Sequence, residues 1–389
     1  MGRILVVTFV SPYPLTSGGA RDIYNRLSAL NQAGYEVDLI VTSRAPVSQE
    51  SIEALRKLAS NVWTVVRRRD IRSLLSFKPF QYQTRRDIRK VALSGEYFAV
   101  ILESEFVGAI LDNPTLNVQH KILRVHNNEP YLYKTLAQDA SSPVSRLLFL
   151  LESAKLSWYS KNLIRRCDHL WFISSEELSE LRKNKQGLLE GRTASLLPTL
   201  VDPNSFRRPS LSSSKVFYAG ALSIPINQQG LLWYLNNIHP NMLSDPAYEF
   251  LLAGQTGDAS IEPLLRAVRA NERVRLFPNA EDLTELQNSA GAFINPIQRG
   301  AGVKIKTIDA AVAGLPVVTT TAGAEGTHFV HGIHAIIADS AEQFEAGLKN
   351  VLTNKILARS LVTASQAILA EQNGFSRQEK LLSSLNDYH

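Results

Sequence analysis

Residues 294–326 read INPIQRGAGVKIKTIDAAVAGLPVVTTTAGAEG, and this stretch holds the pattern that decides the fold. A short apolar run ends at Pro296, and a loop with two glycines follows it. A segment of helical periodicity then covers 304–313, and a second apolar run covers 316–319. A strand, a loop, a helix and another strand in this order are typical of a parallel sheet with crossover helices. The stretch therefore predicts an α/β architecture.

The same alternation continues on both sides of this stretch. In the first half we expect strands at 3–10, 36–41, 62–66, 97–102, 121–125 and 169–173, and helices at 18–33, 49–59, 144–166 and from 174. In the second half we expect strands at 215–221, 249–253, 274–277, 292–295, 316–319 and 335–338, and helices near 228–237, 260–270, 280–289, 304–313, 341–352, 355–372 and 375–385. Between the halves lies a stretch rich in Pro and Ser, which indicates a linker. We therefore predict Rossmann-like domains at 1–200 and 215–372, with a linker at 201–214.

The composition agrees with two globular domains. The chain has 389 residues, of which 44% are hydrophobic and 20% are charged. Its one cysteine, Cys167, allows no internal disulfide and no cysteine cluster for a metal. The first apolar run, 4–10, is too short for a signal peptide or a spanning helix, and no later run reaches eighteen residues. We expect a cytoplasmic protein that is not integral to a membrane.

Loops that follow strands are the places to search for a ligand site, because open α/β sheets bind ligands at the carboxyl ends of their strands. Gly18 and Gly19 lie between a strand and a helix, where backbone N–H groups can face a phosphate; a tight turn is the alternative reading. Gly302, Val303 and a lysine at the following helix start can supply N–H donors and a cation to a diphosphate. Asp309 lies deeper on that helix, in an apolar frame, and can accept from two ribose hydroxyls.

Four motifs together resemble the group 1 glycosyltransferases, family 4 of the retaining enzymes with the GT-B fold, in the branch that reads GaGvKiK. They are SPYPLTSGG at 11–19, LLPTLVDPNSF at 196–206, FYAGALSIPIN at 217–227 and RGAGVKIKTIDAAVAGLPVVTTTAGAEG at 299–326. The resemblance implies two Rossmann-like domains facing across a cleft, with the C-terminal helix at 373–389 returning to the first. It also implies transfer of a sugar from a nucleotide-diphosphate sugar, with retention and without metal, to a glycan, lipid-linked or other acceptor. Assembly of bacterial surface polysaccharide or glycoconjugates is the expected setting.

The resemblance also assigns roles to particular residues. His126 matches the active-site histidine near the donor sugar, and Asp309 stands where a glutamate holds the donor ribose. The remaining donor-binding candidates are Gly18, Gly19, Asn227, Gly302, Val303, Lys304, Lys306 and Glu325. For Glu325, a polar residue at a strand end is an equally good reading. The nucleotide-sugar is a co-substrate, and no resident cofactor and no metal are expected, since the sequence contains no Asp-x-Asp.

Two departures from the family pattern leave other functions open. Ala301 occupies the position of the family's first glutamate, and Ser223 and Asn227 occupy the loop that often carries an Arg…Lys pair. These losses would suit a non-catalytic GT-B partner subunit. A sugar-nucleotide epimerase of the same shape is a further alternative, although it needs additional acids in the cleft.

Positive charge is concentrated in one segment, 67–90, which has nine Lys or Arg and two Asp. Leucine and phenylalanine alternate with the cations, a pattern that favours contact with anionic lipid at the inner face of the membrane or with an anionic acceptor. A solvated loop is the alternative, and no nucleic-acid motif accompanies the segment. The candidate contact residues are Arg67, Arg68, Arg69, Arg72, Arg85 and Arg86. For the leucine-rich run 147–151 in the helix at 144–166, we predict core packing instead.

Overall fold

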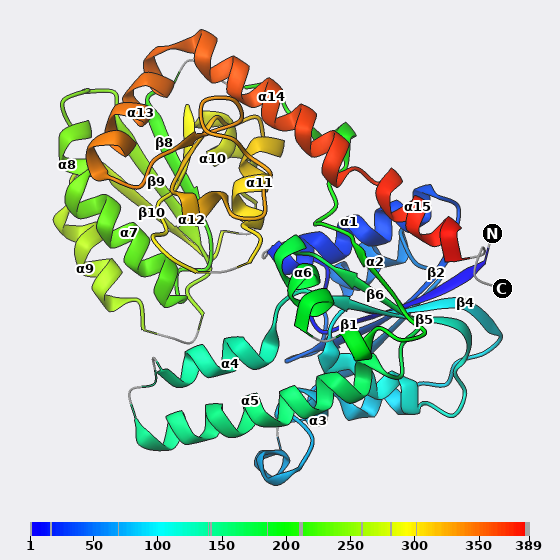
Figure 1. Ribbon diagram of the computed structural model, residues 1–389. Helices are drawn as coiled ribbons and strands as arrows, with labels where there is room; N and C mark the ends of the chain where they lie inside the picture. Colours follow the sequence, from blue (N-terminus) through cyan, green and yellow to red (C-terminus); the bar gives the residue numbers. More distant parts are fainter. Residues whose placement is uncertain are drawn as a thin grey trace. The chain divides into compact units, whose positions relative to one another are not determined.

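The structure is a computed structural model in which the chain forms two compact units (Figure 1). The first consists of Met1–Leu15, Gly19–Leu200 and Phe375–His389, and the second of Thr16–Gly18 and Val201–Gly374. The structure describes residues 2–15, 18–68, 70–138, 140, 142–184, 186–209, 213–257, 260–280, 282–300 and 302–385, without the side chains of residues 71 and 72. Each unit is an α/β sandwich around a parallel sheet.

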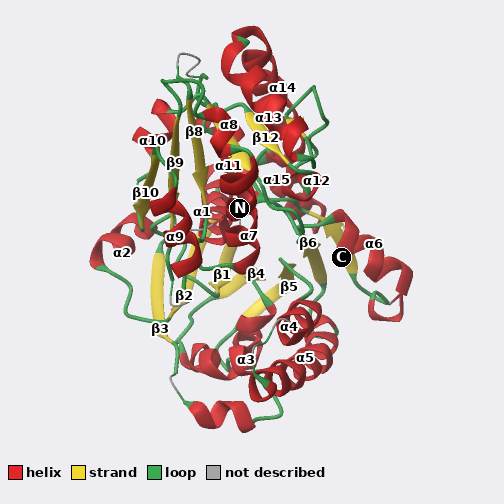
Figure 2. Ribbon diagram, turned by 90° about the vertical axis from the view of Figure 1, so that its left-hand side faces the viewer, coloured by secondary structure: helices red, strands yellow, loops and turns green. Residues whose placement is uncertain are grey.

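The first unit contains a seven-stranded parallel sheet in the order β3-β2-β1-β4-β5-β6-β7 (Figure 2). Its strands are β1 Arg3–Thr8, β2 Glu36–Ser43, β3 Asn61–Val66, β4 Glu96–Leu102, β5 Asn117–Val125, β6 His169–Phe172 and β7 Thr193–Leu196. Its helices are α1 Gly18–Gln32, α2 Gln49–Arg56, α3 Phe80–Arg85, α4 Glu129–Gln138, α5 Pro143–Ile164, α6 Ser175–Asn184 and α15 Ser376–Ser383. Short 3-10 helices cover Ile71–Leu75, Arg86–Lys90, Glu105–Asp112 and Gln186–Leu188.

Strand β1 shows why the sheet forms. Ile4, Leu5, Val6 and Val7 are completely buried, so side chains on both faces of the strand lie in the core. Such uninterrupted apolar runs are typical of parallel sheets covered by helices on both faces. Successive strands are added outward from β1 to β3 and then from β4 to β7, so the order reverses between β1 and β4. Ligands bind at such a switch point in open α/β sheets.

The second unit has a six-stranded parallel sheet in the order β10-β9-β8-β11-β12-β13, with its switch point between β8 and β11. Its strands are β8 Lys215–Ala219, β9 Glu249–Gly254, β10 Val274–Pro278, β11 Ala292–Asn295, β12 Val317–Thr319 and β13 Ile336–Ile337. Its helices are α7 Pro225–Asn237, α8 His239–Met242, α9 Glu262–Ala270, α10 Thr284–Ser289, α11 Ile305–Val312, α12 Thr321–Ala324, α13 Ala341–Thr353 and α14 Lys355–Asn373, with a 3-10 helix at Pro203–Ser205.

The chain passes from the first unit to the second after Leu200 and returns to the first after Gly374. Helix α15 belongs to the first unit, where Leu382 and Leu385 pack in one hydrophobic cluster with residues of α1 and β1. Residues 201–209, expected to form part of a linker, are folded into the second unit instead: the Val201 N–H donates to the Asn373 carbonyl and the Arg207 N–H to the Val312 carbonyl.

Three local expectations differ from the structure. Strand β7 was not expected, because its sequence TASL is short and of mixed polarity. The basic segment 67–90 forms α3 and two 3-10 helices. Core packing of the leucines in α5 is wrong, since Leu147 is 58% and Leu151 is 49% exposed. The buried stripe of α5 lies in its C-terminal half, while its N-terminal half lies alongside α4 (Figure 1). In the described part of the chain, none of the helices has the length and apolar character needed to cross a membrane.

Candidate functional site

The predicted donor-binding residues of the second unit gather at its switch point. The loop after β8 leads into α7, which carries Asn227, and the loop after β11 leads into α11, which carries Lys306. The carboxyl ends of β8 and β11 are adjacent, so residues almost eighty positions apart meet there. The Lys306 Nζ donates to Asn227 Oδ1 at 2.6 Å and to the Tyr218 hydroxyl at 2.9 Å.

Lys306 is a partly buried cation with neutral partners. Burial, followed by the charge of Lys304, lowers the pKa of the Lys306 ammonium to about 7. An ammonium has three N–H donors, and the two partners at the end of β8 and the start of α7 take two of them. Gly220 lies against this group: a Cβ there would be 3.2 Å from the Lys306 Nζ and 2.8 Å from the Tyr218 hydroxyl. The geometry offers an N–H donor and, at neutral pH, a partial positive charge to a ligand.

Lys304 has a different environment, although it is only two residues away. Its Nζ donates to the carbonyls of Gly300 and Gly302 and lies 3.2 Å from Glu325 Oε2. Its backbone N–H donates to the Glu325 carbonyl at 3.1 Å. Lys304 thus links its own loop to the segment after α12, and the Glu325 carboxylate neutralises the charge of Lys304. Both residues were predicted to bind the donor, and the structure gives each a partner within the protein.

The loop before α11 needs its glycines. Gly300 and Gly302 have φ of +118° and +92°, which disfavour residues with a side chain, and Lys304 is the N-cap of the helix. Several N–H groups at this helix start already donate within the protein, those of Ile305 and Thr307 to the carbonyls of Val303 and Lys304. The positive end of the helix dipole still makes this end of α11 favourable for an anion. Asp309 is half-buried on α11, three residues after Lys306 and hence on the same face. Val303 lies in the loop, and Ala301 is outside the described residues.

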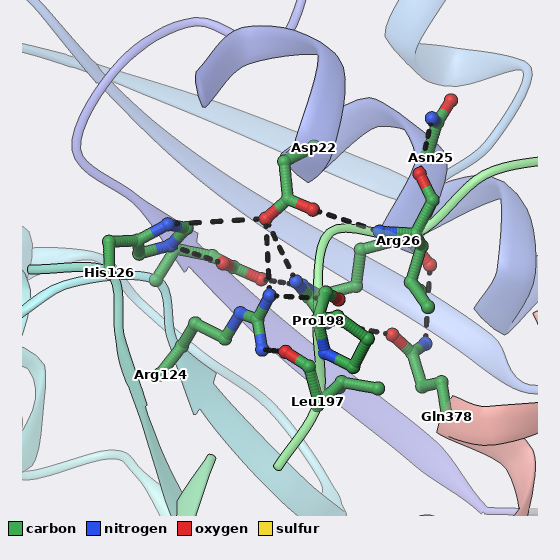
Figure 3. A network of polar contacts seen from close by, with 10 residues as sticks. Asp22, Asn25, Arg26, Arg124, His126, Leu197, Pro198 and Gln378 are labelled. Carbon is green, nitrogen blue, oxygen red and sulfur yellow. Dashed lines mark hydrogen bonds and ion pairs between the residues drawn. The ribbon is translucent and has the colours of Figure 1, made fainter. Parts of the chain in front are cut away.

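In the first unit, His126 directly follows β5 and is 11% exposed (Figure 3). Its Nε2 lies 3.2 Å from Glu103 Oε2, and its Nδ1 lies 4.0 Å from Asp22 Oδ2. Glu103 follows β4, and Asp22 is on α1, so three elements at the switch point of this sheet supply the group. The ring also packs edge-on against Phe9, with centroids 5.7 Å apart.

Two arginines balance the two carboxylates around His126. The Arg26 guanidinium lies 2.6 Å from Glu103 and 3.1 Å from Asp22, and Arg124 lies 3.4 Å from Asp22; these four side chains are completely buried (Figure 3). Burial raises the pKa of both carboxyl groups, but the arginines and His126 together lower it further, so each net pKa lies below its ordinary value. Burial is also the main reason why the pKa of Arg124 falls to about 10.

This buried network also holds the chain segment that leads to the second unit. Arg124 donates to the carbonyls of Leu197 and Pro198, and Asp22 accepts from the Leu200 N–H at 3.1 Å. Arg26 donates to the side chain of Gln378 on α15 at 2.9 Å. Sequence reasoning found only His126 of this network. Two signals in the sequence could have indicated more of the network. Asp22 and Arg26 lie four residues apart in a predicted helix, and Arg124 is a charged residue within an apolar strand.

The other residues predicted in the N-terminal half of the chain are scattered. Gly18 and Gly19 begin α1, and a Cβ at Gly19 would meet only Phe9, at an ordinary 3.9 Å. Arg68 forms an ion pair with Asp87, and Arg86 donates to Gln83 at 3.4 Å. Arg69 lies outside the described residues, as does the side chain of Arg72.

The structure contradicts the predicted membrane contact at Arg85. It is only 3% exposed and donates to Thr42, Gln81 and the Phe9 carbonyl, so it does not reach a lipid surface. Arg85 is buried on α3 together with Tyr82, three residues before it, and Thr84. The Arg67 guanidinium also donates to the side-chain oxygen of Gln81, at 2.9 Å.

Within the described residues, there is no group of three or more His, Cys, Asp or Glu side chains arranged to hold a metal ion. The histidines near β13 have other partners: His331 Nδ1 accepts from the Ile337 N–H, and His334 Nδ1 accepts from the Val330 N–H.

Comparisons with known proteins agree with the geometry of both units. The sequence profile described as Glycosyl transferases group 1 matches residues 213–354. A Klebsiella pneumoniae protein described as "Uncharacterized 44.6 kDa protein in cps region" is 34% identical over 363 residues, covering 91% of this chain and 92% of its own.

Solved structures are similar in fold at low sequence identity. Sucrose-phosphate synthase from Thermosynechococcus elongatus has a TM-score of 0.71 at 14% identity, and HepE from Anabaena in complex with UDP and glucose has 0.66 at 12%. For both, all of this chain and all of the other chain are covered. WaaG, described as a glycosyltransferase involved in lipopolysaccharide biosynthesis, has a TM-score of 0.63 at 14% identity, covering 97% of this chain and 98% of its own. The fold is therefore GT-B.

Proposed function

This chain belongs to the group 1 glycosyltransferases, and on that premise we propose that it moves a sugar from a UDP-sugar to a glycan or lipid-linked acceptor during surface-polysaccharide assembly. Two comparisons support the detail. The Klebsiella relative is described by its position in a cps region, and the structural neighbour HepE is described in complex with UDP and glucose.

One observation carries the donor site: Lys306, with its neutral partners Asn227 and Tyr218, lies at the switch point of the second unit, on the helix that also presents Asp309. A diphosphate needs hydrogen-bond donors and positive charge. The Lys306 ammonium can supply both, and the positive end of the α11 dipole adds to its charge. We propose that Asp309, about one helical turn further on, accepts from the ribose hydroxyls. Glu325 is engaged with Lys304, so we assign it to the loop and not to the sugar.

We propose that transfer proceeds with retention and without a metal. The bond from the anomeric carbon to the diphosphate oxygen breaks, and the acceptor oxygen bonds to that carbon on the same face. The acceptor proton passes to the departing phosphate. Lys306 and the N-terminus of α11 stabilise the charge that develops on the diphosphate.

We further propose that His126 contacts the transferred sugar. The carboxylate of Glu103 accepts from Nε2 and fixes the orientation of the ring, while Phe9 packs against it. Replacing His126 by Ala is expected to lower kcat roughly 100-fold, the effect of losing one preorganised donor, with UDP affinity unchanged. An equal loss of UDP affinity would contradict this assignment.

The first experiment is calorimetric titration of the intact protein with UDP, GDP, dTDP and ADP in EDTA. UDP is expected to bind, and Lys306→Met and Asp309→Ala are each expected to weaken it at least tenfold, since each removes a charge-assisted hydrogen bond. Lys355→Met, an exposed lysine at the start of α14, is the matched control. Failure of all four nucleotides, also after magnesium is added, would reject the donor site and favour the non-catalytic subunit.

The helical pair α4–α5 supports a peripheral contact with an anionic membrane. Its exposed apolar side chains are Tyr131, Leu132, Leu136, Val144, Leu147, Leu148, Leu150, Leu151 and Trp158. The exposed charges that its described residues carry include Lys134, Arg146 and Lys161, whereas Glu129 and Glu152 are buried. An apolar face beside which the exposed charges of the described residues of α4 and α5 are cationic fits a surface of anionic lipid.

Cosedimentation with vesicles tests this contact. Phosphatidylglycerol vesicles are expected to bind the protein more strongly than phosphatidylcholine vesicles, and the double variant Leu147→Glu, Leu151→Glu is expected to lose most of that binding. Ile356→Glu, on the exposed face of α14, serves as the control. If the double variant instead changes the size of the protein in solution and not its vesicle binding, the face joins two copies of the chain.

A further inference from the structure

The first unit contains a pocket of about 370 Å³ that the donor site does not use. It opens at the carboxyl ends of β1 and β2. Its walls include Phe9, Arg44, Arg67, Gln81, Arg85 and Phe106. Three of these six side chains are arginines, and two are aromatic.

Among the described residues, the groups that accept hydrogen bonds from the two inner arginines are neutral. Arg85 donates to the Thr42 hydroxyl at 3.1 Å, to the Phe9 carbonyl at 3.1 Å and to Gln81 Oε1 at 2.7 Å. Arg67 donates to the same Gln81 oxygen at 2.9 Å and to Thr84. One amide oxygen therefore accepts from two cations. In the described part of the chain, neither arginine has a carboxylate within 4.0 Å, whereas Arg26 and Arg68 each do.

This arrangement is electrostatically costly without a further ligand. Burial, together with the charges of Arg67 and Arg44, lowers the pKa of Arg85 to about 9. Burial and Arg44 lower the pKa of Arg67 as well. The acid whose field reaches Arg85 is Glu129, but burial raises the pKa of Glu129 to about 7, so it is only partly ionised at neutral pH. An anion in the pocket would supply the missing charge.

We propose that this pocket binds an anionic group, a phosphate or a carboxylate, carried by the acceptor. The identification of this ligand as the acceptor rests on the proposed function, whereas the anion site itself is inferred from the residues that line the pocket. Guanidinium groups bind both kinds of anion through paired N–H donors. Phe9 and Phe106 provide apolar surface for the part of the acceptor next to its charge. The Arg85 guanidinium lies 5.5 Å from the Phe106 ring centroid, so the aromatic and cationic walls are adjacent.

The test is calorimetric titration with inorganic pyrophosphate and, separately, with glucuronate. Both are added to full-length Lys306→Met protein, so that the proposed donor site does not contribute. At least one probe is expected to bind, and Arg67→Gln and Arg44→Gln are each expected to weaken it at least tenfold. Arg89→Gln is the matched control, because Arg89 is an exposed arginine of the same basic segment that does not line the pocket. Thermal unfolding of each variant checks that it is folded.

The two probes distinguish the two sources of the anion. Binding of pyrophosphate alone identifies a phosphorylated acceptor, and binding of glucuronate alone identifies an acidic sugar. If neither binds, or if the arginine variants bind as the control does, the proposal is wrong. UDP titration of the wild-type chain separates this result from the proposed function. If the wild type does not bind UDP but the pocket binds the anion, the donor site is rejected and the anion site is retained.

Discussion

The charged groups at the two switch points differ in how their charge is balanced. In the first unit, Asp22 and Glu103 face Arg26 and Arg124, so two negative and two positive charges are buried together. In the second unit, Glu325 neutralises Lys304, while the partners of Lys306 among the described residues are neutral and its pKa is about 7. Balanced charges hold the fold together, whereas an unbalanced charge at a strand end marks a place for a ligand. The pocket with Arg67 and Arg85 belongs to the second kind.

The largest expected effect comes from breaking the balanced cluster. Replacing Arg26 by Met leaves Glu103 and Asp22 with one arginine fewer in a fully buried place. The free energy of unfolding is expected to fall by about 3–5 kcal/mol, the usual cost of removing one partner from a buried ion pair. Urea unfolding followed by tryptophan fluorescence measures the change, and Arg56→Met on the surface of α2 is the control. A loss equal to that of the control would show that the cluster does not stabilise the unit.

An intermediate effect is expected from pH, through Lys306. A bound diphosphate favours the protonated lysine, whose pKa without ligand is about 7, so UDP affinity is expected to fall as pH rises above 7. With one proton taken up on binding, the fall approaches tenfold per pH unit. Calorimetry from pH 6.5 to 8.5 measures it, and Lys306→Met should remove the slope. The same slope in both proteins would show that another group titrates.

Stability is expected to change with pH in the opposite direction. The ordinary lysine pKa of 10.5 applies to the unfolded chain and about 7 to the folded one, so the unfolded chain binds more protons between these values. The contribution of Lys306 therefore makes the wild type more stable as pH rises from 7 to 10.5, compared with Lys306→Met. A constant difference between the two proteins over that range would contradict the shifted pKa.

The smallest effect is expected at the balanced pair of the second unit. Glu325 is 36% exposed, and a partly exposed ion pair contributes about 1 kcal/mol or less. Glu325→Gln is therefore expected to change the affinity for UDP and for UDP-glucose by less than about fivefold, and equally for both. A selective loss of UDP-glucose binding would show that Glu325 recognises the sugar after all.

Much of the architecture was predictable because buried strands leave a local signal. Apolar runs such as 97–102 and 292–295 correspond closely to β4 and β11, and the glycine loop before α11 placed Lys306 and Asp309 on one helix. Strand β7 was not predicted, because a strand at the edge of a sheet needs no continuous apolar run. The leucines of α5 were misjudged because periodicity shows which residues share a face, but not whether another element covers that face.

The sequence by itself determined the alternation of strands and helices, the two α/β units and the loops that could bind a phosphate, because these depend on neighbours within a few residues. Only the tertiary structure decided which charges meet. Arg124, Asp22 and Glu103 are far apart in the chain, and parallel strand order brings their ends together. The same holds for Lys306 with Asn227. Whether a charge is neutralised depends on distance in space and on burial, and local sequence carries no direct record of either.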